Sequence, residues 1–309
     1  MIGGSIALER VSYSANAPGR PTRICVGIAT CGRPQQLRIV VDHLRQQTLQ
    51  PSNVILSCFS SDDAGELAAR DDLLILYGPA GAARQRNVVL RNLPQGTDVV
   101  VFFDDDFLPH QDWLKNVVAA FRDDPSIVCI TGNVIADGIK GPGLTFEDAM
   151  QSLKKHKAAD SNWVIENYSP YGCNMAFRRT AIEDVWFDER LGLYAWLEDR
   201  DFGATVARGG GRVIKLGTAV GVHLGVKIGR VSGRKFGYSQ VMNPAYLRAK
   251  GTMTTSQTIR QVLKNVGSNL KGSLQPEPFI DRRGRLLGNL IAVTDLLRGR
   301  VTPQRAETI

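Results

Sequence analysis

The chain has 309 residues, of which 43% are hydrophobic and 22% charged, and its formal net charge is +8. This composition is typical of a folded globular protein and excludes an intrinsically disordered chain. No apolar run approaches the roughly 20 residues that a transmembrane helix needs, so we expect any membrane attachment to be peripheral.

Residues 1–22 contain Gly, Ser and Pro without a clear period and predict a loose N-terminal arm. From Arg23 onward, short apolar runs alternate with segments that have helical periodicity. The apolar runs predict strands at 24–29, 54–59, 73–77, 98–103 and 127–131. The periodic segments predict helices around 37–44, 88–93 and 113–121.

Strands that are apolar on both faces and alternate with helices predict an α/β fold, in which helices flank a mostly parallel central sheet. Ligands of such sheets bind at the carboxyl ends of the strands. Polar residues gather there in this chain, at Thr30, at 60–63 and at 104–106. This edge of the sheet is therefore the predicted binding site.

The second half of the chain begins less regularly and ends in a basic helical extension. Its first predicted elements are a loop at 138–143, a helix at 146–157, a strand at 174–177, a helix at 196–207 and a strand at 212–216. Further helices are predicted at 241–250, 256–270 and 283–297. We therefore expect a domain at 23–225, with halves at about 23–132 and 133–225, and a basic extension at 226–309.

The positive charge is concentrated in the last third of the chain. Residues 1–203 hold 20 Lys and Arg against 26 Asp and Glu, whereas residues 204–309 hold 18 against 4. Such a basic segment suits a diphosphate, an anionic glycan, nucleic acid or an acidic membrane surface. Charge alone does not choose among these partners.

The cysteine pattern bears on the cellular compartment. The chain has five cysteines, and no two of them form a CxxC pair: Cys25, Cys31, Cys58, Cys129 and Cys173. Several of the five lie in apolar segments, where they resemble small core residues. Together with the lack of a signal peptide, this pattern favours a cytoplasmic protein. A peripheral position on the inner face of the membrane is compatible with that expectation.

The run Asp104-Asp105-Asp106 directly follows an apolar predicted strand. Three adjacent carboxylates repel one another unless they are solvated or bound to a cation, and oxygen ligands suit Mg²⁺ or Mn²⁺ on phosphates. The alternative is ordinary turn chemistry before Leu108-Pro109. The location at the ligand-binding edge of the sheet favours the metal interpretation.

The segment FFDDDFLPHQDWL resembles the DXD segment of family 2 glycosyltransferases, which have the GT-A fold. The resemblance implies that Asp104 and Asp106 form the DXD pair, which faces the nucleotide and the metal, and that Asp105 contributes to the donor site. The segment NMAFRR at 174–179 and the later pair Glu198-Asp199 resemble the acceptor half of the same family.

The resemblance implies roles on the acceptor side. Asp199 is expected to be the general base that deprotonates the acceptor hydroxyl, with Glu198 beside it. The alternative is that these acids and Asp201 only complement a helix N-terminus. The implied acceptor-binding residues are Asn174, Tyr194 and Trp196. For the two aromatic residues, packing in the hydrophobic core is the alternative.

The resemblance also implies a donor side. The implied donor-binding residues are Thr30, Arg33, Asp62, Asp63, Arg84, Arg86 and Asn87, together with Asp104 and Asp105. Positive charge near a helix start would favour the diphosphate, although solvated arginines are the simpler alternative. His223 matches a family histidine that contacts metal or pyrophosphate, so the implied metal ligands are Asp104, Asp106 and His223.

These matches imply an inverting glycosyltransferase in bacterial surface polysaccharide synthesis. It would move one sugar from a nucleoside-diphosphate sugar, a UDP- or GDP-sugar, to a hydroxyl of a glycan or lipid-linked acceptor. The implied cofactor is a divalent metal, Mn²⁺ or Mg²⁺. No QxxRW-like segment follows the ED pair, which argues against a processive synthase.

Two other functions stay open. A sugar-phosphate nucleotidyltransferase uses a similar sheet, but its glycine-rich signature with a lysine is largely missing at 31–34. A polyanion-binding protein would use the basic extension, although we expect no nucleic acid as partner. That extension has alternatives of its own: it can lie on an anionic membrane, pack on the domain, or contact a second subunit of a homo-oligomer.

Overall fold

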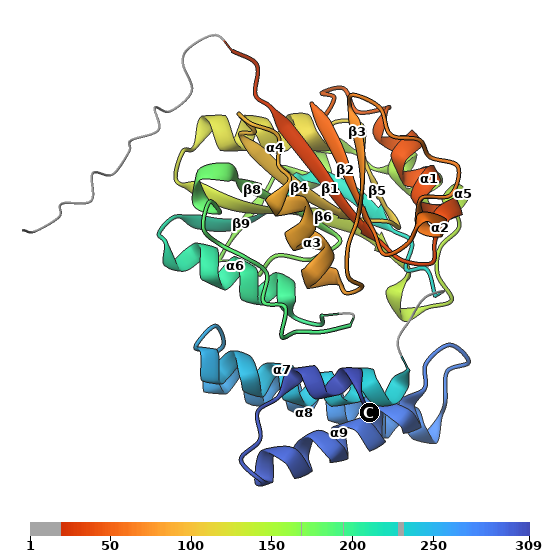
Figure 1. Cartoon of the computed structure of the whole chain (residues 1–309). Coiled ribbons are helices and arrows are strands. Elements are labelled where there is room, and N and C mark those ends of the chain that lie inside the picture. Colours follow the sequence, from red (N-terminus) through yellow and green to blue (C-terminus); the bar gives the residue numbers. More distant parts are fainter. Residues whose placement is uncertain (1–19, 168, 194, 228–231) are drawn as a thin grey trace, which may run out of the picture.

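The computed structural model describes residues 20–167, 169–193, 195–227 and 232–309. An α/β domain lies against a layer of helices formed by the last third of the chain (Figure 1). The predicted α/β class, with a central sheet flanked by helices, is confirmed. Most of the predicted N-terminal arm lies outside the described residues.

The strands are β1 Ile24–Thr30, β2 Asn53–Cys58, β3 Leu73–Tyr77, β4 Val99–Asp104, β5 Phe107–Pro109, β6 Ile127–Asp137, β7 Val164–Glu166, β8 Asn174–Arg178 and β9 Arg212–His223. The α-helices are α1 Pro34–Leu44, α2 Ser61–Ala64, α3 Ala82–Arg91, α4 Trp113–Asp123, α5 Phe146–Lys155, α6 Glu198–Arg208, α7 Gly233–Lys250, α8 Thr255–Leu274 and α9 Arg282–Leu297. Short 3₁₀ turns complete the chain, and the last of them covers Pro303–Glu307.

All these strands join one sheet in the order β3-β2-β1-β4-β8-β6-β9-β5, with β7 pairing β9. Strands β1 to β4 pair in parallel, and β8, β5 and β7 run antiparallel to their neighbours. In the register of β1 with β4, Ala29 lies opposite Asp104. The polar residues that follow these two strands therefore meet at one edge of the sheet, as predicted.

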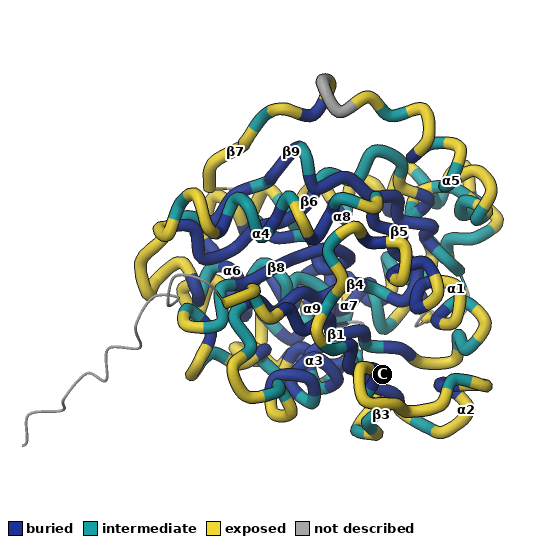
Figure 2. The backbone as a smooth tube through the Cα atoms, turned by 90° about the horizontal axis from the view of Figure 1, so that it is seen from above, coloured by how far each residue is buried: buried dark blue, intermediate teal, exposed yellow. Residues whose placement is uncertain are grey.

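Helices cover both faces of the sheet, and the central strands are buried between them (Figure 2). Side chains alternate along a strand, so neighbouring residues of β1 point to opposite faces of the sheet. Val26 belongs to the hydrophobic core that also contains residues of α1, α4 and α5, and Cys25 belongs to the core that contains residues of α3 and α6. This two-sided burial explains why the strands are continuous apolar runs in the sequence.

Two strands are longer than predicted. β6 continues beyond residue 131 to Asp137, and β9 continues beyond residue 216 to His223. Glycines interrupt the bulky apolar residues of β9, so the sequence pattern predicted only the first part of this strand. Gly221 is needed there, since a Cβ at this position would lie 2.1 Å from the Phe107 ring on the paired strand β5. The extra length brings Asp137 and His223 to the predicted binding edge.

The layer of α7, α8 and α9 is fastened to the α/β domain by polar contacts from α7. The Lys250 ammonium donates to Asp188 at 2.8 Å and to Asp201 at 2.5 Å, and the Thr252 hydroxyl donates to Asp201 at 2.6 Å. Asn243 donates to the Trp196 carbonyl at 2.8 Å. Within the described part of the chain, none of the helices has the length and apolarity that crossing a membrane demands.

Replacing Asp201 should weaken this attachment and the whole fold. The Asp201 side chain is almost fully buried, so Asp201→Ala leaves Lys250 with Asp188 alone and the buried Thr252 hydroxyl with only the long 3.4 Å contact to the Leu247 carbonyl. We expect the free energy of unfolding to fall by about 3 kcal/mol, measured by urea denaturation. Asp42→Ala, which removes a half-exposed carboxylate, should change it little. Equal midpoints for the two variants would contradict this role of Asp201.

Candidate active site

A cavity of about 1030 Å³ lies at the predicted edge of the sheet, bounded by the ends of β1 and β4 and by the start of α6. It brings together most of the residues predicted for donor and acceptor: Thr30, Arg33, Arg84, Arg86, Asp104, Asp105, Trp196, Glu198 and Asp199. Asp106 and His223 lie next to it, in an adjoining cavity that Asp104 also lines. The two acidic groups of the sequence therefore share one site.

Asp105 is tied to the first strand and its loop. It accepts a hydrogen bond from the Thr30 hydroxyl at 2.7 Å and another from the Arg33 guanidinium at 2.9 Å. Burial raises the pKa of Asp105 to about 7, although the charge of Arg33 opposes this rise. Thr30 and Arg33 thus hold the middle acid of the run in place.

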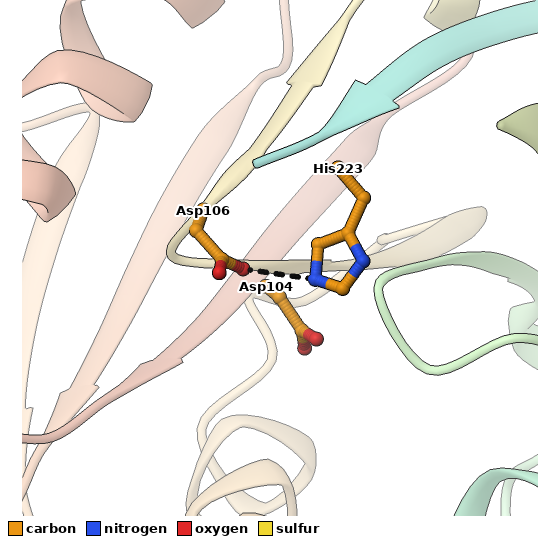
Figure 3. A group of neighbouring side chains, drawn as sticks. All are labelled: Asp104, Asp106 and His223. Carbon is orange, nitrogen blue, oxygen red and sulfur yellow. Dashed lines mark ion pairs between the residues drawn. The ribbon is translucent and has the colours of Figure 1, made fainter. Parts of the chain in front are cut away.

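Asp106 and His223 face each other, and the Asp104 side chain lies beside them (Figure 3). One potential ligand atom from each lies within 4.8 Å of the others, and His223 Nε2 lies 3.3 Å from Asp106 Oδ1. On the far side of the ring, His223 Nδ1 lies 2.9 Å from Asp137 Oδ1. The Tyr171 hydroxyl donates to Asp137 at 3.0 Å. The ring is thereby held with Nε2 directed at the carboxylates.

This group suits a divalent metal. Two carboxylates and an imidazole match the ligand preferences of Mn²⁺, and a carboxylate on the outer ring nitrogen is typical of metal-binding histidines. Burial lowers the pKa of His223, but hydrogen bonds to Asp106 and Asp137 outweigh it and raise the pKa to about 10. The site therefore favours positive charge at Nε2, the position where a metal ion would bind.

Arg86 joins the two ends of the site. Its side chain is buried and donates to Asp104 at 2.9 Å, to the Gly172 carbonyl at 3.1 Å and to Glu198. Burial opposes the charge of Arg86, but Glu198 and Asp104 outweigh burial and raise its pKa. One guanidinium therefore neutralises acids that come from β4 and from α6.

Asp199 is oriented by backbone amides. Its Oδ2 accepts from Gly172 at 2.8 Å and its Oδ1 accepts from Arg200 at 2.7 Å. Burial raises its pKa above the ordinary value. The carboxylate lines the cavity, so a substrate hydroxyl can approach it.

The backbone leading to this acid pair is strained. Leu193, Ala195 and Leu197 have φ values of 60°, 48° and 75°. These values lie in the left-handed region, which residues other than glycine rarely adopt. Strain of this kind persists only when surrounding contacts enforce it, and it concentrates at functional sites. One enforcing contact is visible, a 3.2 Å hydrogen bond from the Ala82 amide to the Leu193 carbonyl. Because Leu197 is left-handed, α6 begins at Glu198 and Trp196 lies before the helix.

Several predicted residues lie away from the cavity. Asp62 is exposed on α2, and Asp63 accepts from the amides of Gly32, Phe59 and Ser60 at 2.5–2.9 Å. Asn87 is buried against the Phe187 backbone, with 2.9 Å hydrogen bonds in both directions. These side chains shape the turns around the site.

One of the two remaining acceptor predictions, Asn174, also lies away from the cavity lining. Asn174 is fully buried and donates to Cys173 Sγ at 3.3 Å. Tyr194 lies outside the described residues. Sequence reasoning missed Asp137, Tyr171 and Gly172, which orient His223 and Asp199. For Asp137, the apolar pattern continuing from 127 was an available signal.

The fold and the paired acidic groups define a glycosyltransferase of the GT-A fold. The model of Glycosyl transferase family 2 matches residues 25–186, and the chain belongs to this family. No curated protein sequence matches the chain.

Two solved structures illustrate the fold. Mannosyltransferase PcManGT from Pyrobaculum calidifontis, in complex with GDP-Man and Mn²⁺, is 17% identical, with a TM-score of 0.51 over 97% of this chain and 82% of that chain. TarS 1–349 from S. aureus is 14% identical, with a TM-score of 0.50 over 90% of this chain and 92% of that chain. At these identities the similarity concerns the fold alone.

If His223 binds a metal, its partner Asp137 should tune the affinity. Asp137→Asn preserves a hydrogen-bond acceptor but removes the charge behind the ring, and such changes lower metal affinity about 10–100-fold. Calorimetric titration of the whole chain with Mn²⁺ measures the effect. Asp123→Asn, on the exposed end of α4, is the control and should leave the affinity unchanged. Equal Mn²⁺ affinity in the two variants would contradict the role of Asp137 behind a metal-binding His223.

Proposed function

We propose that this glycosyltransferase moves one sugar, with inversion, from a nucleoside-diphosphate sugar to a hydroxyl of a glycan or lipid-linked acceptor. The observation that carries the proposal is the cavity in which Arg86 links Asp104 to Glu198, the neighbour of Asp199. The PcManGT complex with GDP-Man and Mn²⁺ supports this class of donor and cofactor. A role in surface polysaccharide synthesis follows from the resemblance to family 2 enzymes of that kind.

Asp104, Asp106 and His223 would hold the divalent metal, Mn²⁺ or Mg²⁺. Such an ion supplies charge neutralisation and orientation for a diphosphate. The protein contributes Arg86, whose buried guanidinium reaches Asp104 and adds positive charge beside the leaving group. Thr30 and Arg33 shape the nucleoside side of the cavity through Asp105. Arg84 lines the same cavity and is paired with Glu307 at 2.9 Å.

At the acceptor end, Asp199 is the proposed general base. The acceptor oxygen forms a bond to the anomeric carbon as the bond to the diphosphate breaks, and Asp199 takes the hydroxyl proton. Glu198 is poorly suited to this role, because burial and then the charge of Asp199 raise its pKa to about 8 and it is held by Arg86. Trp196, at the cavity wall, offers a ring on which a sugar can pack.

The family match favours sugar transfer over the nucleotidyltransferase alternative. Polyanion binding through the basic extension would be independent of the acids in the cavity and steeply weakened by salt. Activity that survives moderate salt but disappears on removal of the Asp199 carboxylate would therefore support sugar transfer over polyanion binding.

The proposal is tested in two steps on the whole chain. A thermal-shift screen of nucleoside-diphosphate sugars with and without Mn²⁺ should find a donor whose stabilisation requires the metal. With that donor, Asp199→Asn should reduce turnover roughly 10²–10⁴-fold, the usual contribution of a general base, and leave donor affinity within a factor of about two.

The pH profile gives a further readout of the same base. Because burial raises the pKa of Asp199, kcat/KM of the wild type should rise with pH through a value above the ordinary Asp range. Glu307→Gln, another carboxylate that lines the cavity but is paired with Arg84, serves as the control and should keep that limb. Near-normal turnover by Asp199→Asn would remove Asp199 from the mechanism.

We also propose that α8 and α9 lie on an anionic membrane surface. Each helix carries a row of exposed apolar side chains three to seven residues apart, along one side: Ile259, Leu263, Leu270 and Leu274 on α8, and Leu287, Leu290, Val293 and Leu297 on α9. Their exposed fractions range from 40% to 85%. The opposite side of α8 lines the cavities with Gln261 and Lys264. Helix α8 contains lysine and arginine but no acidic residue, which complements anionic lipid.

Leu263→Gln combined with Leu270→Gln should weaken binding to vesicles that contain phosphatidylglycerol by at least about tenfold, because each buried leucine contributes roughly 1.5–3 kcal/mol. Co-sedimentation of the whole chain measures it. Val164→Gln with Ile165→Gln, exposed on β7, is the control. If the α8 variant sediments like the wild type, or if it instead dissociates a dimer seen by analytical ultracentrifugation, the surface does not face a membrane.

A further inference from the structure

A second cavity, of about 400 Å³, adjoins the first. The two share Arg33, Asp104, Ile139, Phe236 and Lys264 in their walls. Asp106 and His223 form one side of the second cavity, and residues of α8 and α9, among them Ser268 and Arg285, form the other. The helices that follow the matched family region thus build a wall opposite the candidate metal ligands.

The two cavities differ in charge. Among the described residues of the first cavity, five Lys and Arg face five Asp and Glu. In the second cavity, five Lys and Arg face three Asp and Glu: Arg33, Lys140, Lys264, Arg282 and Arg285 against Asp104, Asp106 and Glu277. A divalent ion bound by Asp104 and Asp106 would increase the excess of positive charge. This excess of positive charge in the second cavity favours an anionic ligand.

Part of this charge is already balanced within the protein. Arg33 lies 2.9 Å from Asp105 and 3.7 Å from Asp106, and Arg282 forms two hydrogen bonds of 2.7 and 2.8 Å to Glu277. Lys140 and Lys264 are exposed, and neither forms an ion pair with another described residue. Arg285 lies over the Phe236 ring, 4.5 Å from its centroid. The exposed ammonium groups of Lys140 and Lys264 are therefore the cations best placed to meet a ligand.

We propose that the second cavity binds a phosphoryl group through Lys140 and Lys264, opposite the metal group. Lysine is a compact, mobile charge that suits phosphate, and a charge-assisted hydrogen bond is about twice as strong as a neutral one. The phosphoryl group comes either from a phosphorylated acceptor or from the diphosphate of the donor. The assignment of these substrates rests on the proposed function, whereas the anion site itself stands on the charges.

The test uses one double variant that carries both Lys140→Ala and Lys264→Ala. This variant is compared with the wild type at constant ionic strength. The probe is inorganic phosphate in the presence of Mg²⁺, titrated calorimetrically into the whole chain. We expect phosphate affinity to fall at least about tenfold, which corresponds to roughly 1.4 kcal/mol. The control is Lys115→Ala with Lys271→Ala, two exposed lysines outside both cavities, the latter on α8 itself. It should bind phosphate as the wild type does.

A parallel titration with GDP and with UDP, each with Mn²⁺, identifies the source. A parallel loss of nucleotide affinity assigns the cavity to the donor diphosphate, and unchanged nucleotide affinity assigns it to a phosphorylated acceptor. The proposed site is refuted if the wild type binds no phosphate. It is also refuted if the lysine variant and its control lose phosphate affinity equally. Phosphate bound as expected by a chain that binds no nucleotide-sugar would instead refute the proposed function and leave the anion site intact.

Discussion

The structure of the site depends on one buried cation. Arg86 is 3% exposed and lies between Asp104 at the end of β4 and Glu198 at the start of α6, two elements far apart in the chain. An unpaired buried charge costs several kcal/mol, and so does a buried carboxylate without a partner. The three groups are therefore stable only together. This mutual requirement fixes the distance between the acids of the donor side and those of the acceptor side.

A second constraint is the length of two strands. β6 and β9 run past the core to Asp137 and His223, and the close approach of Gly221 to Phe107 allows β9 to pair with β5. The pairing places His223 directly opposite Phe107, one residue after Asp106. The imidazole then lies between two carboxylates that balance its charge. Backbone register, more than any local motif, thus assembles the candidate metal group.

The C-terminal helices belong to the site as much as to the surface. Phe236 of α7 and Lys264 of α8 line both cavities, and Glu307 near the chain end pairs with Arg84. Contacts of Lys250 and Thr252 with Asp201 fasten this layer to α6, next to the acid pair. A helix such as α8, with polar residues toward the cavities and leucines toward solvent, can connect catalysis to a surface where the acceptor is held.

The amino-acid sequence by itself determined the α/β class and the position of Asp104, Asp105 and Asp106 at a strand end, because two-sided burial and strand ends leave local patterns. It also indicated Glu198-Asp199 as a second acidic group. Only the tertiary structure decided which neighbours those acids meet. Asp63 accepts from three backbone amides and Asn174 is buried in the sheet, whereas Asp137 and Lys264 reach the site from distant elements. Such contacts join residues up to 223 positions apart, as Arg84 and Glu307 are, and no local period encodes them.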